Sequence, residues 1–368
     1  MTTPRIDRHG LRFYPLAERE DRVFVPGDLV SPDEQPERLS EFASRVAQET
    51  ADRLRTAREN DRARMLVFGA HTIKNGLGPI IARLAEQGWL THLATNGAGI
   101  IHDWEFAFQG HSSEHVAQNV AQGKFGMWEE TGRYINLAIA VGAWRGLGYG
   151  ESVGALVEQE GLDMPTPEAL EAEVHAALDT LDAPRAAAAA DLLGVLRDQA
   201  IPAGWLFVPH PHKACGLQAA AFRLGVPFTG HPMFGHDIIY LHPMNHGPSI
   251  GRTAERDFLS FAHSVSHLDG GVYLSIGSAV MSPMVFEKSV SMAQNLAQQR
   301  GERLESHFMT IVDLQESHWD WTQGEPPEDN PDYYLRFNKS FNRMGGQLRY
   351  ACADNRDFLL AILHALEG

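Results

Sequence analysis

The segment Phe68-Gly-Ala-His-Thr-Ile-Lys-Asn-Gly-Leu-Gly-Pro79 decides the fold, together with Leu93-Ala-Thr-Asn-Gly-Ala-Gly-Ile-Ile-His-Asp-Trp-Glu105. In each segment a short apolar strand stops at small and polar residues, and a helical pattern follows. Two consecutive strand–helix units are typical of a parallel sheet, whose ligands bind beyond the carboxyl ends of the strands. Glycines there allow close approach of a ligand, and the helix N-termini behind them favour an anion such as a pyrophosphate.

The same alternation continues along the rest of the chain. We expect strands over residues 65–68, 90–95, 205–208, 238–241, 272–276, 308–313 and 348–351. We expect helices over residues 36–60, 78–87, 112–121, 131–144, 213–224, 254–268, 281–300 and 356–367. Repeated alternation predicts an α/β, Rossmann-like fold with a mainly parallel sheet and helices on both faces.

The chain divides into two parts by composition. Residues 1–33 are rich in charge and proline, and we interpret them as an N-terminal arm packed on the body or on a neighbouring subunit. Residues 34–368 are expected to form a single domain. Within it, residues from about 150 to 200 are rich in Ala, Leu and Glu, which indicates a helical insertion on one side of the sheet.

Charge and cysteine content limit the partners and the compartment. The 368 residues carry a formal net charge of -16, from 31 basic and 47 acidic side chains, which disfavours a nucleic-acid partner. Only Cys215 and Cys352 are present, so a disulfide framework is excluded and a cytoplasmic location is the simplest expectation. Since no apolar run approaches the roughly 18 residues of a membrane span, we expect no membrane partner.

The cluster His102-Asp103-Trp104-Glu105 is the first candidate for chemistry. An ordinary histidine changes charge near neutral pH, so His102 is suited to act as a general base. Asp103 and Glu105, with Asp237 further along the chain, are expected to hold the cationic end of a substrate. The alternative is structural, with Asp103 capping a helix and Glu105 in solvent.

Two further groups are candidates with competing interpretations. Six histidines lie between residues 210 and 246, which raises a metal-dependent hydrolase as an alternative. No H-E-x-x-H or C-x-x-C accompanies them, so we expect structural or substrate-contacting histidines and no metal. Lys339 has aromatic neighbours, and a lysine in apolar surroundings has a lowered pKa and can form an imine; the alternative is an exposed lysine.

Several segments resemble the deoxyhypusine synthase family, and they occur in that family's order. These segments are Val67–Gly76, Ala94–Glu105, Pro227–Leu241, Tyr273–Val280 and Arg336–Leu366. The resemblance implies a deoxyhypusine synthase-like domain over residues 34–368, in a homotetramer that binds NAD between subunits. It also implies that an amine is oxidised to an imine, passed to an enzyme lysine, and reduced with the same cofactor.

The resemblance also implies roles for individual residues. Phe337-Asn338-Lys339 falls where the family has its lysine motif, which makes Lys339 the imine-forming residue. The residues implied to contact NAD are Asn75, Thr95, Asn96, Gly97, Gly99, Gly277, Ser278, Asp313 and Asp354.

Departures from the family pattern concern the substrate site more than the cofactor site. His102 stands where the family has an acid, His231 and His236 fall in the polyamine region, and Phe337 replaces a tryptophan. We therefore expect NAD binding and a small amine or amino-acid-like substrate, with group transfer of the homospermidine or deoxyhypusine type.

The sequence leaves other functions open. The opening block also looks like the NAD-binding domain of ornithine cyclodeaminases of the arginine dihydrolase-fusion type. The alternatives are accordingly an NAD-using lyase or cyclodeaminase acting on a small amino acid, and a protein that binds NAD without catalysis.

Overall fold

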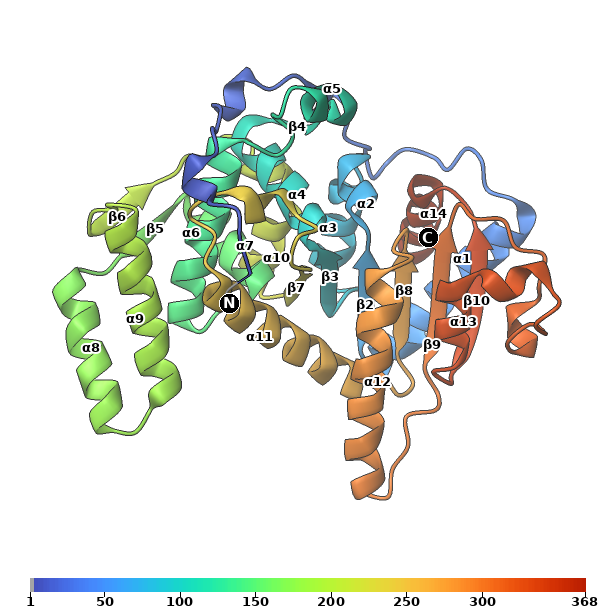
Figure 1. Ribbon diagram of the computed structural model, residues 1–368. Coiled ribbons are helices and arrows are strands. Elements are labelled where there is room, and N and C mark those ends of the chain that lie inside the picture. Colours follow the sequence, from blue (N-terminus) through green and yellow to red (C-terminus); the bar gives the residue numbers. More distant parts are fainter. Residues whose placement is uncertain (1–2) are drawn as a thin grey trace.

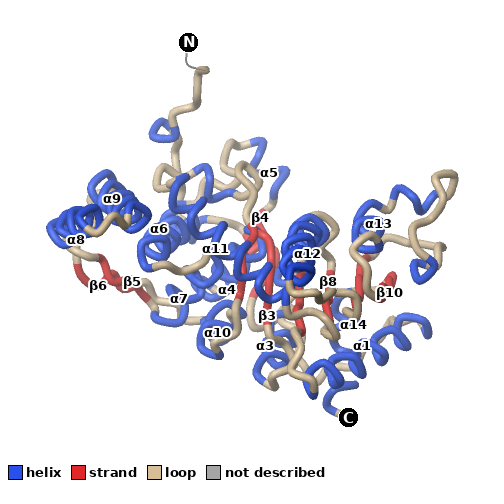
Figure 2. Tube along the Cα trace, turned by 90° about the horizontal axis from the view of Figure 1, so that it is seen from below, coloured by secondary structure: helices blue, strands red, loops and turns tan. Residues whose placement is uncertain are grey.

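The computed structural model describes residues 3–368, and within them a six-stranded parallel sheet forms the centre of the fold. Figure 2 shows these strands in a row between helices. Their bounds are β2 (Arg64–Phe68), β3 (His92–Asn96), β7 (Phe228–His231), β8 (Val272–Ile276), β9 (Phe308–Asp313) and β10 (Gln347–Cys352).

The strand order creates a crevice at the middle of the sheet. From one edge to the other the order is β7-β3-β2-β8-β9-β10, all parallel. Within this sheet, the first strand along the chain is the central β2. The next strands, β3 and β7, lie outward on one side of β2, and β8 then lies on its other side. This is the order of Rossmann folds, in which a ligand binds where the direction of winding reverses. Here that place is beyond the ends of β2 and β8.

Helices cover both faces of the sheet because the strand residues are apolar on both sides. Leu66 and Phe68 of β2 belong to one hydrophobic cluster, whereas Met65 and Val67 point into another. On the first face lie α1 (Glu41–Glu59), α3 (Gly78–Glu86), α10 (Leu217–Leu224) and α14 (Asn355–Glu367), and on the second lie α11 (Gly247–Ser266) and α12 (Met281–Gln299).

Further helices extend the molecule beyond the β7 edge of the sheet. The central helices of this region are α4 (Gly97–Gln109), α6 (Glu129–Arg145) and α7 (Tyr149–Gln159). Beyond them a two-stranded antiparallel sheet of β5 (Gly161–Met164) and β6 (Gly204–Phe207) carries the hairpin of α8 (Pro167–Asp179) and α9 (Ala183–Asp198). Figure 1 shows this hairpin projecting at the left of the molecule. The insertion expected over about 150–200 corresponds to this region, except that α7 packs into the body against α10 and β7.

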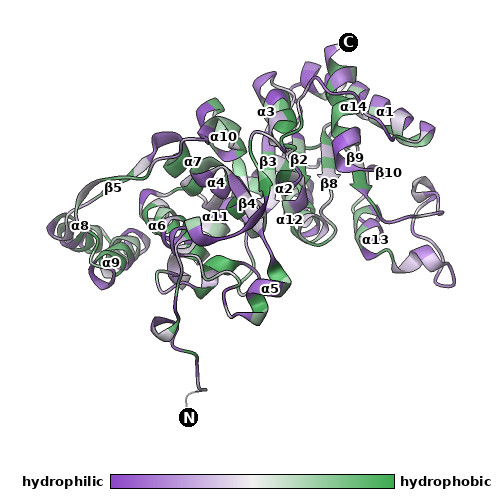
Figure 3. Cartoon of the chain, turned by 90° about the horizontal axis from the view of Figure 1, so that it is seen from above, coloured by the Kyte–Doolittle hydropathy of each residue, from purple (hydrophilic) through white to green (hydrophobic). Residues whose placement is uncertain are grey.

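The N-terminal arm lies along the body and takes part in a small sheet of its own. Strand β1 (Asp21–Phe24) pairs antiparallel with β4 (His111–Glu114), a strand that is hydrophilic along its length (Figure 3). The arm then runs to the C-terminal helix, where Glu34 contacts Arg356 and the Pro32 carbonyl contacts His364. This pairing positions the residues that precede β1 over α4.

The remaining elements are short. They are α2 (Ala70–Lys74), α5 (Val116–Ala121), α13 (Arg336–Asn342) and 3-10 helices at Arg8–Gly10, Leu16–Glu18, Lys213–Cys215, Ile238–Leu241, Trp321–Gln323 and Pro331–Tyr334. Among residues 3–368, no helix combines the length and apolar character needed to cross a membrane.

Two expectations about local structure are wrong, and one expected strand lies outside the central sheet. The strand expected over 238–241 is a 3-10 helix, because a short apolar run does not by itself distinguish a strand from a helical turn. The strand in this part of the chain is β7, which lies earlier in the sequence. Residues 112–114 are strand β4 and only 116–121 are helical, since pairing with the arm outweighs the capping signal of Ser112. The strand expected over 205–208 exists as β6, but it pairs with β5 outside the central sheet.

Candidate active site at the carboxyl edge of the sheet

The turns after β2 and β8 pack against each other at the central crevice. A Cβ atom on Gly69 would lie 2.1 Å from the carbonyl oxygen of Gly277, so only glycine fits there. Gly277 has a φ of +59°, and a Cβ on it would lie 2.5 Å from Nδ2 of Asn355. The backbone is therefore bare at the point where the Rossmann order predicts a ligand.

The helix after β8 presents an open N-terminus to this crevice. Helix α12 starts at Met281 without a side-chain cap at Val280, although Ser278 Oγ accepts from the Ser282 N–H at 3.3 Å. Ala279 and Val280 are exposed. Unpaired N–H groups and the helix dipole favour an anion at such a position.

Polar groups from the two following strands flank the same turn. Asp313 ends β9 and is partly exposed, while the neighbouring Val312 carbonyl accepts from the Gly277 N–H at 2.9 Å. Asp354 caps α14 by accepting from Arg356 N–H at 2.8 Å. The Oδ1 atom of Asn355 is buried and has no hydrogen-bond partner. Of the predicted cofactor residues, Gly277, Ser278 and Asp313 thus lie together, and Asp354 adjoins them.

The predicted residues on the other side of the crevice hold the start of α4 in place. Thr95 Oγ1 donates to the Phe68 carbonyl at 2.9 Å, and Asn96 caps α4 by accepting from Gly99 N–H at 2.9 Å. A Cβ on Gly97 would lie 2.1 Å from Oδ2 of Asp237, so these two residues touch. Asn75, in contrast, is exposed at the end of α2.

His102 lies at the end of a chain of hydrogen bonds. Its Nδ1 atom is 2.7 Å from Ser112 Oγ, and Ser112 donates to the carboxylate of Glu105. Because the carboxylate only accepts, the Ser112 hydroxyl must accept from His102 Nδ1–H. The lone pair of His102 then lies on Nε2, which makes no hydrogen bond among residues 3–368. Sequence and structure agree in bringing His102 and Glu105 together.

A buried arginine from the arm completes this chain. Arg19 Nη1 and Nη2 lie 2.8 and 2.7 Å from the two oxygens of Glu105, and Arg19 Nε lies 2.7 Å from Asp21. Thr131 also donates to Glu105 at 2.9 Å. The expectation that Glu105 lies in solvent or holds a substrate cation differs from this placement, since its charge is already matched inside the protein.

Burial and charge set the protonation states of these groups. Burial lowers the pKa of His102, whereas the neighbouring Glu105 acts to raise it. The positive charges of Lys74 and Arg19, together with His71, lower this pKa further. His102 is therefore neutral at pH 7 and able to accept a proton. Burial alone would raise the pKa of Glu105, but Arg19 holds that pKa below its ordinary value.

Asp103 points away from His102. Its oxygens accept from the N–H groups of Leu217 and Gln218 at 2.7 and 2.9 Å, and from Nε2 of Gln218 at 3.0 Å. Burial raises the pKa of Asp103, although these hydrogen bonds act to lower it. Asp103 therefore lies within α4 and joins it to the start of α10, which differs from the structural alternative of a cap on its own helix.

Asp237 approaches the same edge from the loop after β7. Its side chain contacts Gly97 at the start of α4, and its Oδ2 atom is buried without a hydrogen-bond partner. Burial raises the pKa of Asp237 to about 7. This carboxylate is one strand away from the central crevice, because Thr95 of β3 pairs with Phe68 of β2.

Lys339 lies far along the sheet from His102. It belongs to α13, which packs beside β10, whereas α4 follows β3. Lys339 Nζ lies 2.9 Å from Glu325 and 3.2 Å from the ring centroid of Tyr333. Desolvation acts to lower the pKa of Lys339, but Tyr333 and Glu325 raise it above its ordinary value. An imine-forming lysine needs the opposite shift, and the role of Lys339 stays a prediction.

The histidines between residues 210 and 246 are dispersed. His210 Nδ1 contacts the Val208 carbonyl, His231 Nε2 contacts Thr229, and His242 Nε2 contacts Glu129. In the described chain, residues 3–368, no three His, Cys, Asp or Glu side chains are arranged to hold a metal ion.

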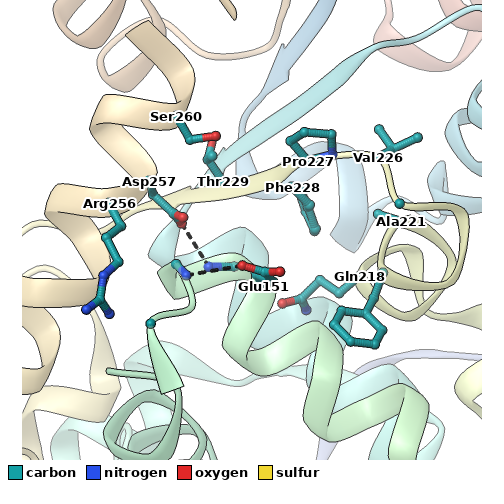
Figure 4. A pocket seen from close by; sticks show the side chains of 15 residues that line it. Glu151, Gln218, Ala221, Val226, Pro227, Phe228, Thr229, Arg256, Asp257 and Ser260 are labelled. Carbon is teal, nitrogen blue, oxygen red and sulfur yellow. Dashed lines mark hydrogen bonds between the residues drawn. The ribbon is translucent and has the colours of Figure 1, made fainter. Parts of the chain in front are cut away.

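A cavity of about 370 Å³ lies along the outer edge of β7, at the amino end of that strand (Figure 4). Asp257 on α11 lies in its wall and accepts from the N–H groups of Gly150 at 2.9 Å and Gly230 at 2.6 Å. Burial raises the pKa of Asp257 to about 7. Asp257 therefore ties the start of α7 to β7, and the cavity is separate from the central crevice.

Comparison with solved structures yields several matches of low identity. A LOR/SDH protein from Methanococcus maripaludis S2 is 14% identical, with 94% of this chain and 74% of that chain covered and a TM-score of 0.45. AgrE in its ternary complex with ornithine and NAD+ is 13% identical, with 90% of this chain and 34% of that chain covered and a TM-score of 0.44. ArgZ, an arginine dihydrolase from the ornithine-ammonia cycle in cyanobacteria, is 13% identical, with coverages of 90% and 33% and a TM-score of 0.44.

The identification with the deoxyhypusine synthase family is wrong. The structures just named are a LOR/SDH protein, AgrE and ArgZ, rather than deoxyhypusine synthases. No protein-family model matches the chain. Curated proteins likewise give no match. The chain spans about a third of the length of AgrE and ArgZ.

Sequence reasoning missed the residues that act through long-range contacts. Arg19, Ser112 and Asp257 each complete an arrangement whose other members are elsewhere in the chain. A charged residue in an arm that is otherwise polar gives no sign that it is buried. The one available signal is Arg19-Glu-Asp21, a compact group of charges just before a strand.

Proposed function

We propose that this chain is an NAD-dependent enzyme that acts on a small amine or amino acid, as a lyase or cyclodeaminase. The observation that carries the proposal is the unit β8–α12–β9, in which a bare glycine turn, an open helix N-terminus and a strand-end carboxylate lie together. These are the three parts of a dinucleotide site in a Rossmann fold, although the G-x-G-x-x-G spacing is absent.

In this proposal the residues of that unit hold the cofactor. Gly277 and Ser278 receive the pyrophosphate at the N-terminus of α12, where its negative charge meets unpaired N–H groups. Asp313 accepts hydrogen bonds from ribose hydroxyls. The buried, unpaired Oδ1 of Asn355 beside Gly277 is a further polar contact for a ligand in the crevice.

The other half of the crevice supplies the proton chemistry. When bound, NAD would supply the acceptor for a hydride from the substrate carbon that carries an amine. His102 accepts a proton at Nε2, because its Nδ1–H is engaged by Ser112. Glu105 stabilises the resulting imidazolium through Ser112, and Arg19 keeps that carboxylate charged.

The lyase or cyclodeaminase form is favoured over aminoalkyl transfer for one reason. Transfer through a covalent imine needs a lysine with a lowered pKa, and the pKa of Lys339 is raised while its ammonium group pairs with Glu325. In the cyclodeaminase reaction a second amine of the substrate would add to the imine and expel ammonia, and the hydride held by the cofactor would return to the product, so that no enzyme lysine is needed. Product analysis separates the two reactions, since only transfer joins the substrate carbon to a second amine molecule.

The test is cofactor binding by calorimetry, followed by ammonium release from a panel of amino acids. We expect NAD to bind the wild-type chain and to raise its melting temperature by mass action. Asp313→Asn should weaken NAD binding by about tenfold, as expected for losing a charged acceptor, whereas Glu316→Gln in the same exposed loop should not. Absence of NAD binding to the wild-type protein would refute the proposal.

A further inference from the structure

Three buried oxygen atoms of neighbouring residues have no hydrogen-bond partner among residues 3–368. They are Oδ2 of Asp237, the hydroxyl oxygen of Tyr149 and the hydroxyl oxygen of Tyr240. The relative exposure of these residues is 8%, 0% and 7%. Native proteins leave few buried polar atoms unpaired, because each loses its hydration without compensation.

Packing at two glycines fixes the positions of Asp237 and Tyr149. Asp237 touches Gly97, the first residue of α4, and the Tyr149 ring would lie 2.5 Å from a Cβ on Gly230. Strand pairing brings the two glycines together, because Thr95 pairs with Gly230. Asp257 binds the backbone beside these residues, because it accepts from the N–H groups of Gly150, which follows Tyr149, and of Gly230.

The electrostatics of this cluster show that a positive charge is missing. Burial raises the pKa of Asp237 to about 7, and no ion pair of residues 3–368 offsets this. Burial, and then Asp237, raises the pKa of both Tyr149 and Tyr240 above the ordinary value. Each group would be stabilised by a cation that also donates hydrogen bonds.

We propose that Asp237, Tyr149 and Tyr240 form a subsite for the primary ammonium group of the substrate. A primary ammonium has three N–H donors, and the cluster offers three acceptor oxygens, one of them charged. A hydroxyl or a quaternary ammonium lacks either the charge or the donors. This subsite deepens the proposed function and rests on it, because it names the group that the enzyme recognises.

The subsite lies one strand away from the central crevice that holds the proposed cofactor site. Gly97 follows Asn96, whose strand neighbours β2 and the Gly69 turn. Residues 232–236 lead directly into Asp237, and the Phe234 ring lies 5.1 Å from that of Tyr240. Phe234 is 62% exposed.

The experiment measures binding of n-butylamine to the full chain by NMR titration at about pH 8, where the amine is protonated and Asp237 is mostly ionised. n-Butanol and tetramethylammonium are the matched probes. The variants are Asp237→Asn and Tyr240→Phe. Tyr273→Phe is the control, because Tyr273 is an equally buried tyrosine whose hydroxyl already pairs with Ser282 at 2.8 Å.

We expect n-butylamine to bind at least about tenfold more tightly than either probe, since only it supplies both charge and donors. Asp237→Asn should abolish this preference, Tyr240→Phe should reduce it several-fold, and Tyr273→Phe should leave it unchanged. Equal binding of amine and alcohol to the wild-type chain overturns the inference, and so does an absence of amine binding. These wild-type comparisons hold even where a variant fails to fold.

NAD binding to the same preparation separates this inference from the proposed function. If NAD binds and n-butylamine does not, the subsite is wrong and the cofactor proposal stands. If n-butylamine binds with the expected preference and NAD does not, the ammonium site stands and the proposed enzyme activity fails.

Discussion

Single residues set the chemistry of this site through their protonation states, and Asp237 is the clearest case. A folded-state pKa of about 7 means that the native protein keeps its proton at pH values where the unfolded chain has lost it. Ionisation of Asp237 therefore destabilises the fold. Its contribution to the free energy of unfolding falls as pH rises from about 4 to about 7, and it stays low above that range.

Asp237→Asn tests this directly. We expect the variant to be more stable than the wild type at about pH 8, by at most about 4 kcal/mol, and equally stable near pH 4. Urea unfolding at several pH values measures the difference. Asp257 also has a pKa of about 7, but it is present in both proteins and its effect cancels. A variant less stable than the wild type at pH 8 would show that the carboxylate is already compensated.

His102 gives a second prediction at the residue scale. Ser112 accepts from His102 Nδ1–H, so the wild-type imidazole should be the Nδ1–H tautomer. In Ser112→Ala the acceptor is gone, and we expect a mixture of tautomers. Nitrogen-15 NMR of the imidazole distinguishes the two forms.

The control for this prediction uses another histidine. His246 Nδ1 contacts Ser249 at 2.9 Å, so Ser249→Ala should affect His246 and leave His102 as it was. A pure Nδ1–H form of His102 in Ser112→Ala would mean that Ser112 does not determine the tautomer.

At the scale of elements, Arg19 joins the arm to the candidate active site. The pairing of β1 with β4 holds the arm against α4, and Arg19 enters the body just before that pairing begins. Its partner Glu105 is 86 residues away in the chain and almost fully buried. Removing one member of a buried pair leaves the other charge uncompensated, which costs far more than the net contribution of the pair.

Arg19→Met should accordingly lower the free energy of unfolding by about 3–5 kcal/mol. Arg22→Met is the matched control, because Arg22 belongs to the same arm but is exposed, and we expect it to change stability by less than about 0.5 kcal/mol. The double variant Arg19→Met/Glu105→Gln should recover part of the loss. Equal stability of Arg19→Met and the wild type would contradict the buried pair.

At the scale of the whole molecule, the two halves of the sheet have different tasks. The half made of β8, β9 and β10 carries the proposed cofactor site, and the half made of β2, β3 and β7 carries His102 and Asp237. The two halves meet at Gly69 and Gly277, where the winding reverses. The homotetramer expected from the sequence stays a prediction, and native mass measurement tests it against a chain mass of 40.7 kDa.

The sequence by itself determined the elements whose signal is local. Apolar runs and amphipathic periodicity located β2, β8, β9, α12 and α14, and the polar residues after the strands indicated the carboxyl edge as the site. The predictions of these elements succeed because strand and helix patterns repeat every two or about 3.6 residues, within one element, whereas the site at the carboxyl edge stays a prediction. The same local reasoning failed at Ile238–Leu241, where a short apolar run has no period to decide it.

Only the tertiary structure decided which charges are free and which are paired. Asp103 and Glu105 stand two residues apart in one motif, yet Asp103 binds the start of α10 and Glu105 binds Arg19. Asp237 gained its significance from two tyrosines and a glycine that the sequence does not connect with it. The physical reason is that the pKa and the role of a buried group depend on neighbours brought together by folding, and a residue's own sequence context does not contain them.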